Sequence, residues 1–219
     1  MNHYVNLDEI NDKNNPRSSV GTSPWIPTGT TIPNCSECGE SMLLFLQIEL
    51  EEKHALPFYT GSQLVVCMCP GCNEIPSFDE FVPGKLEDMY WDNYEGHFFI
   101  AMYTSGRELV THELKKFLKP FEMEFIKEEG ALSHSENIRV GGDPFWLQDA
   151  EANICSCGSE MKLICQVPEN FAFEKLTSAP EQPDSFSSDD YCLFLGNETY
   201  IFGCVSQCSE RAVKVVVQG

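Results

Sequence analysis

The chain has 219 residues, 42% hydrophobic and 22% charged, which is the composition of a globular protein with a buried core. Its formal net charge is −20, so its surface repels phosphate backbones, and nucleic acid is excluded as an expected partner. No apolar run approaches the roughly 18 residues that span a bilayer, and the N-terminus lacks a signal-peptide pattern. We therefore expect a cytoplasmic protein with no membrane association.

The first stretch, residues 1–18, is polar, and we expect it to be a flexible leader. An internal repeat follows it. The segment "VGTSPWIPTGTTIPNCSECGESMLLFLQ" begins at Val20, and "VGGDPFWLQDAEANICSCGSEMKLICQ" begins at Val140. The shared positions are Val20, Gly21, Pro24, Cys35, Cys38, Gly39, Met42, Leu44 and Gln47, matched by Val140, Gly141, Pro144, Cys155, Cys157, Gly158, Met161, Leu163 and Gln166. This repeat predicts two tandem, pseudo-twofold related modules, 19–130 and 131–219.

Most of the remaining pattern predicts strands, because apolar runs rich in β-branched and aromatic residues recur between turn signals. The expected strands are 42–50, 97–104, 161–167, 191–196, 198–205 and 212–218. Gly196-Asn197 predicts a two-residue hairpin turn. Residues 107–118 have helical spacing of apolar residues and are expected to be a helix ending before Pro120. Residues 177–190 are expected to be a mobile polar loop. The fold class is mainly β with a few helices (α+β).

Cysteine spacing in the first module indicates a metal site. Cys35 and Cys38 form one Cys-x-x-Cys hook, and Cys69 and Cys72 form another after the strand-like run "QLVV". Two intervening residues let both thiolates of a hook reach one tetrahedral ion, and pairing of the two strands would bring the hooks together. Cys67 points to the opposite strand face and is interpreted as a buried thiol, although ligation by Cys67 in place of Cys69 stays an alternative.

The second module offers a distorted version of the same site, formed by Cys155, Cys157, Cys204 and Cys208. One residue is missing from its first hook and one is added to its second, so Cys-x-Cys is tighter than the usual spacing. Zinc is the preferred ion for both modules, one or two per chain. An iron–sulfur cluster or the absence of metal stays open for the second. Cys165 and Cys192 lie in apolar runs and are expected to be core thiols.

Four thiolates leave a metal no open coordination position, so both sites are expected to be structural rather than catalytic. The five histidines show no ligand spacing, and the sequence has no nucleophile elbow, phosphate loop or dinucleotide fingerprint. We therefore expect no enzymatic activity and no catalytic residues. A metal-dependent enzyme is retained only as the least favoured alternative.

The motifs "GGDPFWLQ", "CSCGSEMKLICQV" and "DDYCLFLGNETYIFGCVSQC" resemble the YwqG-like domain of unknown function, common in bacteria. Their order is also similar to the C-terminal part of the programmed cell death protein 2 family. The resemblance covers residues 140–208 well and 20–72 more weakly, and Cys155 departs from the family's spacing. The positions that match are Gly141, Gly142, Pro144, Trp146, Gln148, Cys157, Gly158, Met161, Gln166 and Cys204.

The resemblance implies a twisted β-rich fold that binds a protein. The first functional hypothesis is an immunity protein that occludes a cognate antibacterial toxin domain, and the second is an escort for a basic ribosomal protein. The acidic charge suits electrostatically steered capture of a basic partner in both cases. Residues 124–130 and 177–190 are the expected binding segments. Trp25 and Trp146 are interpreted as core residues because they occur at similar places in the two repeats.

Overall fold

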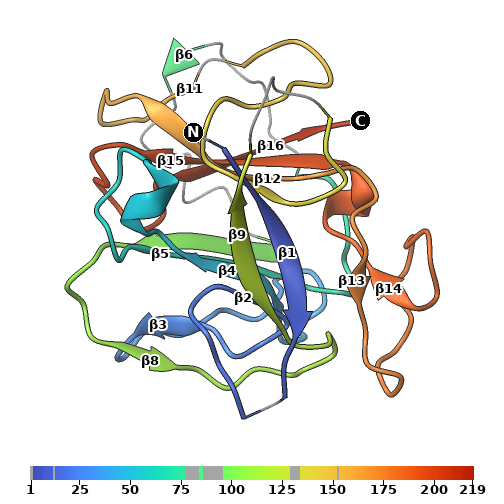
Figure 1. Ribbon diagram of the computed structural model, residues 1–219. Coiled ribbons are helices and arrows are strands. Elements are labelled where there is room, and N and C mark those ends of the chain that lie inside the picture. The colour runs from blue at the N-terminus through green and yellow to red at the C-terminus, as the bar shows by residue number, and fades with distance from the viewer. Residues whose placement is uncertain (1, 12, 77–83, 86–95, 129–133, 152) are drawn as a thin grey trace.

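The computed structural model describes residues 2–11, 13–76, 84–85, 96–128, 134–151 and 153–219 (Figure 1). Its main feature is a ten-stranded sheet in the order β16-β15-β12-β10-β1-β9-β2-β4-β5-β7. The bounds are β1 His3–Glu9, β2 Ser19–Val20, β4 Leu43–Glu49, β5 Gln63–Met68, β7 Phe98–Tyr103, β9 Phe121–Lys127, β10 Arg139–Val140, β12 Met161–Val167, β15 Glu198–Cys204 and β16 Val213–Gln218. The mainly β prediction is confirmed.

The sheet curls into a nearly closed barrel, because its two edge strands approach each other. The N–H of Met102 on β7 donates to the carbonyl of Glu210, just before β16, at 2.9 Å. Apolar side chains of both halves fill one continuous core, in which Phe45 and Ile164 are fully buried. Three two-stranded pieces complete the β structure: β3 (Trp25–Pro27) with β8 (Leu109–Thr111), β6 (Gly84–Lys85) with β11 (Asn153–Ile154), and β13 (Phe173–Glu174) with β14 (Asp190–Tyr191).

The two halves of the sheet repeat each other down to an irregularity. The pairing of β4 with β5 shifts register at Phe45, and that of β12 with β15 shifts at Ile164. In each half a glycine N–H donates to the bulged residue's carbonyl, Gly21 to Phe45 at 3.3 Å and Gly141 to Ile164 at 2.9 Å. Both glycines have positive φ, and a Cβ on Gly21 would lie 2.5 Å from a backbone oxygen. The repeated Val-Gly motif therefore serves a close backbone approach.

The two strands that precede the repeats in the chain, β1 and β9, each pair with the strand that opens the other repeat. β1 precedes β2 in the chain but pairs with β9 and with β10 of the second half. β9 precedes β10 but pairs with β2 of the first half. In Figure 1 these two strands cross between the layer with β4 and β5 and the layer with β12 and β15. The expectation of a flexible leader over 1–18 is therefore wrong for His3–Glu9. The polar side chains at its exposed positions did not indicate a strand, although its backbone pairs with strands on both sides.

Two further expectations are wrong. Residues 107–118 form the short strand β8 and irregular backbone, because the N–H groups of His112 and Lys119 donate to Pro24 and Glu174 instead of to their own turns. Gly196-Asn197 does not join a hairpin, because residues 191–196 divide between β14 and a 3-10 turn, η2 (Phe194–Gly196). Apart from η2 and a second 3-10 turn, η1 (Glu52–His54), the described residues contain no helix. None of them forms a helix long and apolar enough to cross a membrane.

Candidate metal centres

The first candidate centre brings together the four cysteines that the hooks predicted. The sulfur atoms of Cys35, Cys38, Cys69 and Cys72 all lie within 4.8 Å of one another, and Cys38 Sγ is 3.5 Å from Cys69 Sγ. Four thiolates about 2.3 Å from one tetrahedral ion would be separated by roughly 3.8 Å. The cysteines are free thiols, not disulfides. The arrangement therefore matches a tetrahedral thiolate site.

Strand pairing assembles this centre. The first hook precedes β4, the second follows β5, and the antiparallel pairing of Leu43 with Met68 places both hooks at one end of the hairpin. The first hook is a tight turn, in which the Cys35 N–H donates to the Glu40 carbonyl and the Gly39 N–H donates back to Cys35. Gly39 has a φ of 76°, a left-handed conformation that glycine adopts without strain.

The second centre has the same construction at the end of the β12–β15 hairpin. All four sulfur atoms of Cys155, Cys157, Cys204 and Cys208 again lie within 4.8 Å of one another. Two Sγ–Sγ distances are 3.5 Å, between Cys155 and Cys208, and 3.6 Å, between Cys157 and Cys204. The missing residue and the added residue therefore do not prevent the four thiols from meeting.

The shortened hook keeps the hydrogen bonds of the longer one. The Cys155 N–H donates to the Ser159 carbonyl at 2.9 Å, as Cys35 does to Glu40. The Gly158 N–H donates to the Cys155 carbonyl at 2.8 Å, one residue nearer in sequence than the bond from Gly39 to Cys35. A smaller turn thus closes the same loop. The deletion changes the size of the turn, and the four sulfur atoms still lie within 4.8 Å of one another.

Within each group of four cysteines, the surroundings lower the pKa of some thiols and raise the pKa of others. Hydrogen bonds from the side chain and backbone of Ser159 lower the pKa of Cys157 to about 6. The backbone N–H of Glu40 lowers the pKa of Cys38. Burial raises the pKa of Cys69 to about 11 and also raises that of Cys155. A bound cation would supply the positive charge that the buried thiols need to ionise.

The other cysteines lie away from both groups. Cys67 and Cys165 are fully buried among apolar side chains, so Cys67 does not replace Cys69, and both are core thiols as expected. Cys192 is also buried, and its sulfur accepts a hydrogen bond of 3.2 Å from the Asn73 side chain. Burial raises the pKa of each of these three thiols.

The repeated glutamine has a role that sequence spacing did not reveal. Gln47 Oε1 accepts the Trp25 N–H at 2.9 Å, and Gln166 Oε1 accepts the Phe145 N–H at 3.0 Å. Each glutamine thus fastens the segment that precedes the cysteine hook of its half to the central strand that follows the hook. The recurrence of the same residue at one offset was the only signal in the sequence.

The tryptophans have different surroundings. Trp146 packs at a tilt against Tyr200 and stacks on Phe202 beside the second centre, at ring-centroid distances of 4.6 and 5.7 Å. Trp25 is half-buried, and its Nε1–H donates to the Asn15 carbonyl. Both tryptophans were expected in the core, but both are half-buried: Trp146 packs against a buried cluster, whereas Trp25 joins no apolar cluster of the described residues.

Asn73 was not singled out by the sequence. It follows Cys72 directly, is buried, and bonds to Cys192 and to the N–H of Leu195. It therefore connects the first four-cysteine group to the second half of the chain.

No family model matches this chain, and a search of curated proteins finds no match either.

Proposed function

We propose that this protein is a zinc-stabilised binding protein without a catalytic centre. The observation that carries the proposal is the pair of closed four-cysteine groups at the ends of the two central hairpins. A four-thiolate shell leaves no position for a substrate or a water molecule, and such sites typically stabilise a fold. Each ion would clamp the two hooks of its hairpin where strand pairing ends.

A single zinc ion in each group fits better than an iron–sulfur cluster. A cluster distributes its four thiolates over several iron atoms, which spreads the sulfur atoms more widely than one ion does. The sulfur atoms here all lie within 4.8 Å, and the closest approach is 3.5 Å. Elemental analysis of purified protein should find two zinc ions per chain. Iron together with acid-labile sulfide would favour the cluster instead.

The proposed partner is a basic protein, because the chain carries a net charge of −20. Complementary charge accelerates encounter and selects against acidic competitors. The resemblance to YwqG-like proteins remains a prediction, and with it the first candidate: an immunity protein that occludes an antibacterial toxin domain in the cytoplasm. An escort for a basic ribosomal protein is the second candidate supported by the same charge.

Two experiments distinguish these candidates. Co-expression with toxin domains encoded beside the gene should rescue growth in one case if the protein confers immunity. Affinity capture with the tagged protein should recover that toxin, whereas an escort would recover one ribosomal protein. If the protein binds neither a toxin domain nor a ribosomal protein, the proposal is overturned. A variant with Asp184 and Asp189 changed to asparagine keeps both metal centres and tests whether charge contributes.

A further inference from the structure

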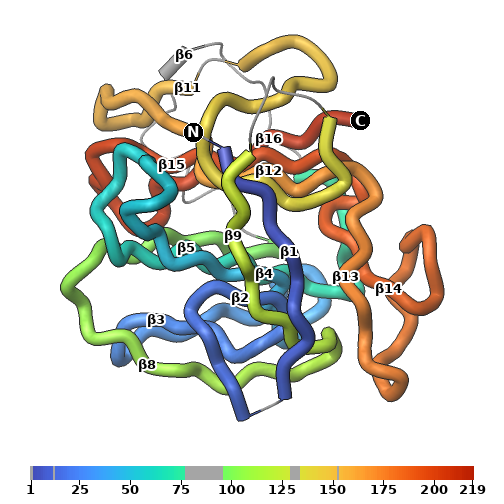
Figure 2. Tube along the Cα trace, in the orientation of Figure 1, coloured from blue at the N-terminus to red at the C-terminus, as the bar shows by residue number. Residues whose placement is uncertain are grey.

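The two halves differ in the length of the connection between their paired central strands. In the first half, residues 50–62 join β4 to β5, whereas residues 168–197 join β12 to β15 in the second. The second connection, called here the insert, is more than twice as long. Figure 2 shows the insert in orange, with β13 and β14 projecting from the side of the barrel. The repeated elements are common to both halves, whereas the insert distinguishes the second half from the first.

The insert packs against the barrel and is also held by hydrogen bonds between its own residues. Phe173 packs edge-on against Phe45 of the first half, with ring centroids 5.1 Å apart. Within the loop expected to be mobile, Gln182 is buried and its side chain bonds to both backbone groups of Cys192, at 2.7 and 3.1 Å. The Tyr191 hydroxyl donates to the Pro180 carbonyl at 2.7 Å. The insert is therefore a preorganised surface, which reduces the ordering cost of binding.

Two large apolar side chains remain exposed on this surface. Phe186 is 50% exposed and Leu195 is 38% exposed. They are close to the same glycine, since Leu195 precedes Gly196 and a Cβ built on Gly196 would lie 3.5 Å from the Phe186 ring. We call Phe186, Leu195 and Gly196 the Phe186 surface.

The backbone holds Leu195 outward against its own preference. Phe194, Leu195 and Gly196 have φ values of 45°, 60° and 79°, and bulky residues rarely adopt this left-handed region. Surrounding contacts maintain the turn, because Asn73 accepts the Leu195 N–H at 3.0 Å and the Phe194 ring packs on Phe98. Strained residues of this kind concentrate at ligand-binding positions.

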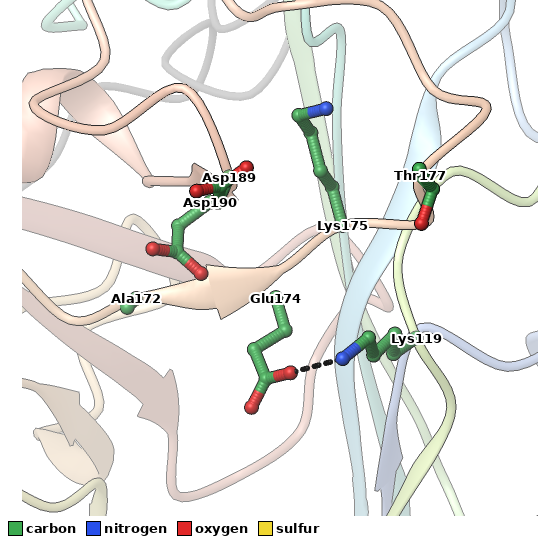
Figure 3. A pocket seen from close by; sticks show the side chains of 7 residues that line it. All are labelled: Lys119, Ala172, Glu174, Lys175, Thr177, Asp189 and Asp190. Carbon is green, nitrogen blue, oxygen red and sulfur yellow. Dashed lines mark hydrogen bonds and ion pairs between the residues drawn. The ribbon is translucent and has the colours of Figure 1, made fainter.

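The insert is also strongly acidic. It holds six carboxylates and one lysine. That lysine, Lys175, donates to the Ala179 carbonyl, and Lys119 from outside the insert pairs with Glu174 (Figure 3). Glu181, Asp184 and Asp189 form no ion pair with any other residue that the structure describes. Asp189 and Asp190 line an open pocket of about 530 Å³ that also includes Glu174.

We propose that the Phe186 surface, with the carboxylates of Glu181, Asp184 and Asp189, docks a lysine- or arginine-rich segment that carries an apolar side chain. The inference rests on the proposed function and assigns it to one face of the molecule. Apolar contact with Phe186 and Leu195 would anchor the segment, and the unpaired carboxylates would select a basic one. An acidic peptide or an anionic membrane would be repelled by the same charges.

The test uses the full-length protein and a short fluorescein-labelled peptide in which lysines flank two leucines. Anisotropy titrations compare the wild type with the double variant Phe186→Ser/Leu195→Asn, which keeps the net charge and places an αL-tolerant residue at position 195. Val110→Ser is the control, since Val110 is 39% exposed on β8, far from the insert in Figure 1. Circular dichroism and zinc content verify that all variants fold.

We expect the double variant to bind the peptide about tenfold more weakly or worse, and Val110→Ser to bind like the wild type. Equal binding by all three proteins would show that the affinity comes from the general negative charge, and it would overturn the proposal that the Phe186 surface docks the peptide. Absence of binding to the wild type, or equal binding of a glutamate version of the peptide, would overturn it too. Self-association lost in the double variant would identify a second copy as the occupant. These results do not depend on the natural partner, so failed toxin or ribosomal capture remains a separate result.

Discussion

Lowering the pH should destabilise the protein through His54, a fully buried histidine in η1. Its Nδ1 accepts the Glu51 N–H at 3.1 Å, and its ring packs against Phe125 at a centroid distance of 4.5 Å. Protonation would remove that acceptor and place a charge in the interior beside His3. Burial lowers the pKa of His54 to about 4, whereas an unfolded histidine titrates near 6.5.

The sign follows from which state binds the proton first. Above about pH 6.5 both states are neutral at this position, so His54 contributes no pH dependence. Between about pH 6.5 and 4 the unfolded state is protonated and the folded state is not, so the free energy of unfolding falls as pH falls. From the two pKa values, the loss at about pH 5 is roughly 2 kcal/mol relative to pH 7.5.

Urea unfolding followed by circular dichroism at several pH values measures this loss. Acid would also protonate the thiolates of the proposed metal sites, so the informative quantity is the stability difference between the wild type and variants at position 54. His54→Gln and His54→Leu should both be less stable than the wild type at pH 7.5, and each difference should narrow by about 2 kcal/mol at pH 5. Differences that stay constant or widen as pH falls would refute the reasoning.

Three further predictions concern the metal centres, the first strand and the repeated glutamine. Cys69→Ser should reduce zinc content by one ion per chain and destabilise the fold by several kcal/mol, whereas Cys67→Ser, on the same strand, should keep both ions and cost about 1–3 kcal/mol. Elemental analysis and urea unfolding measure both effects, and equal zinc loss in the two variants would contradict the assignment. Deletion of residues 1–11 should prevent folding, because β1 fills the middle of the sheet, and a synthetic peptide of those residues should restore the circular dichroism spectrum; a folded truncated chain would contradict the central position of β1. Gln166→Leu should destabilise the protein by about 1–3 kcal/mol, because it leaves the Phe145 N–H without its acceptor, whereas the Phe145 carbonyl keeps its hydrogen bond from the Tyr200 hydroxyl. An unchanged urea midpoint would show that the glutamine is not needed.

The ligand sets could be predicted because their signals are local. Each hook is a few residues long, and each lies beside an apolar strand whose pairing with the next brings two hooks to one end of a hairpin. Judged by spacing alone, the one-residue deletion between Cys155 and Cys157 weakened the prediction of a metal site in the second module. Only the turn geometry, in which the Gly158 N–H donates to the Cys155 carbonyl, showed that a shorter hook still brings its sulfur atoms to those of the second hook.

The errors arose where distant contacts decide the backbone. Residues 107–118 have the apolar spacing of a helix, but Leu109–Thr111 pairs with β3 and the His112 N–H donates to the Pro24 carbonyl. Residues 191–196 have a strand-like composition, but Asn73 and the Phe98 ring hold Phe194 and Leu195 in a left-handed turn. Propensity is a weak preference, and tertiary partners overrode it in both segments.

By itself, the sequence determined that this protein is a duplicated, mainly β chain with two four-cysteine groups, because repetition and ligand spacing are properties of neighbouring residues. The tertiary structure alone decided that β1 pairs with β10 of the second repeat and β9 with β2 of the first, since partners that lie far apart in the chain leave no local signal. It also decided which apolar side chains stay exposed. Phe186 and Leu195 resemble core residues in composition, and only the packing of the insert leaves them at the surface.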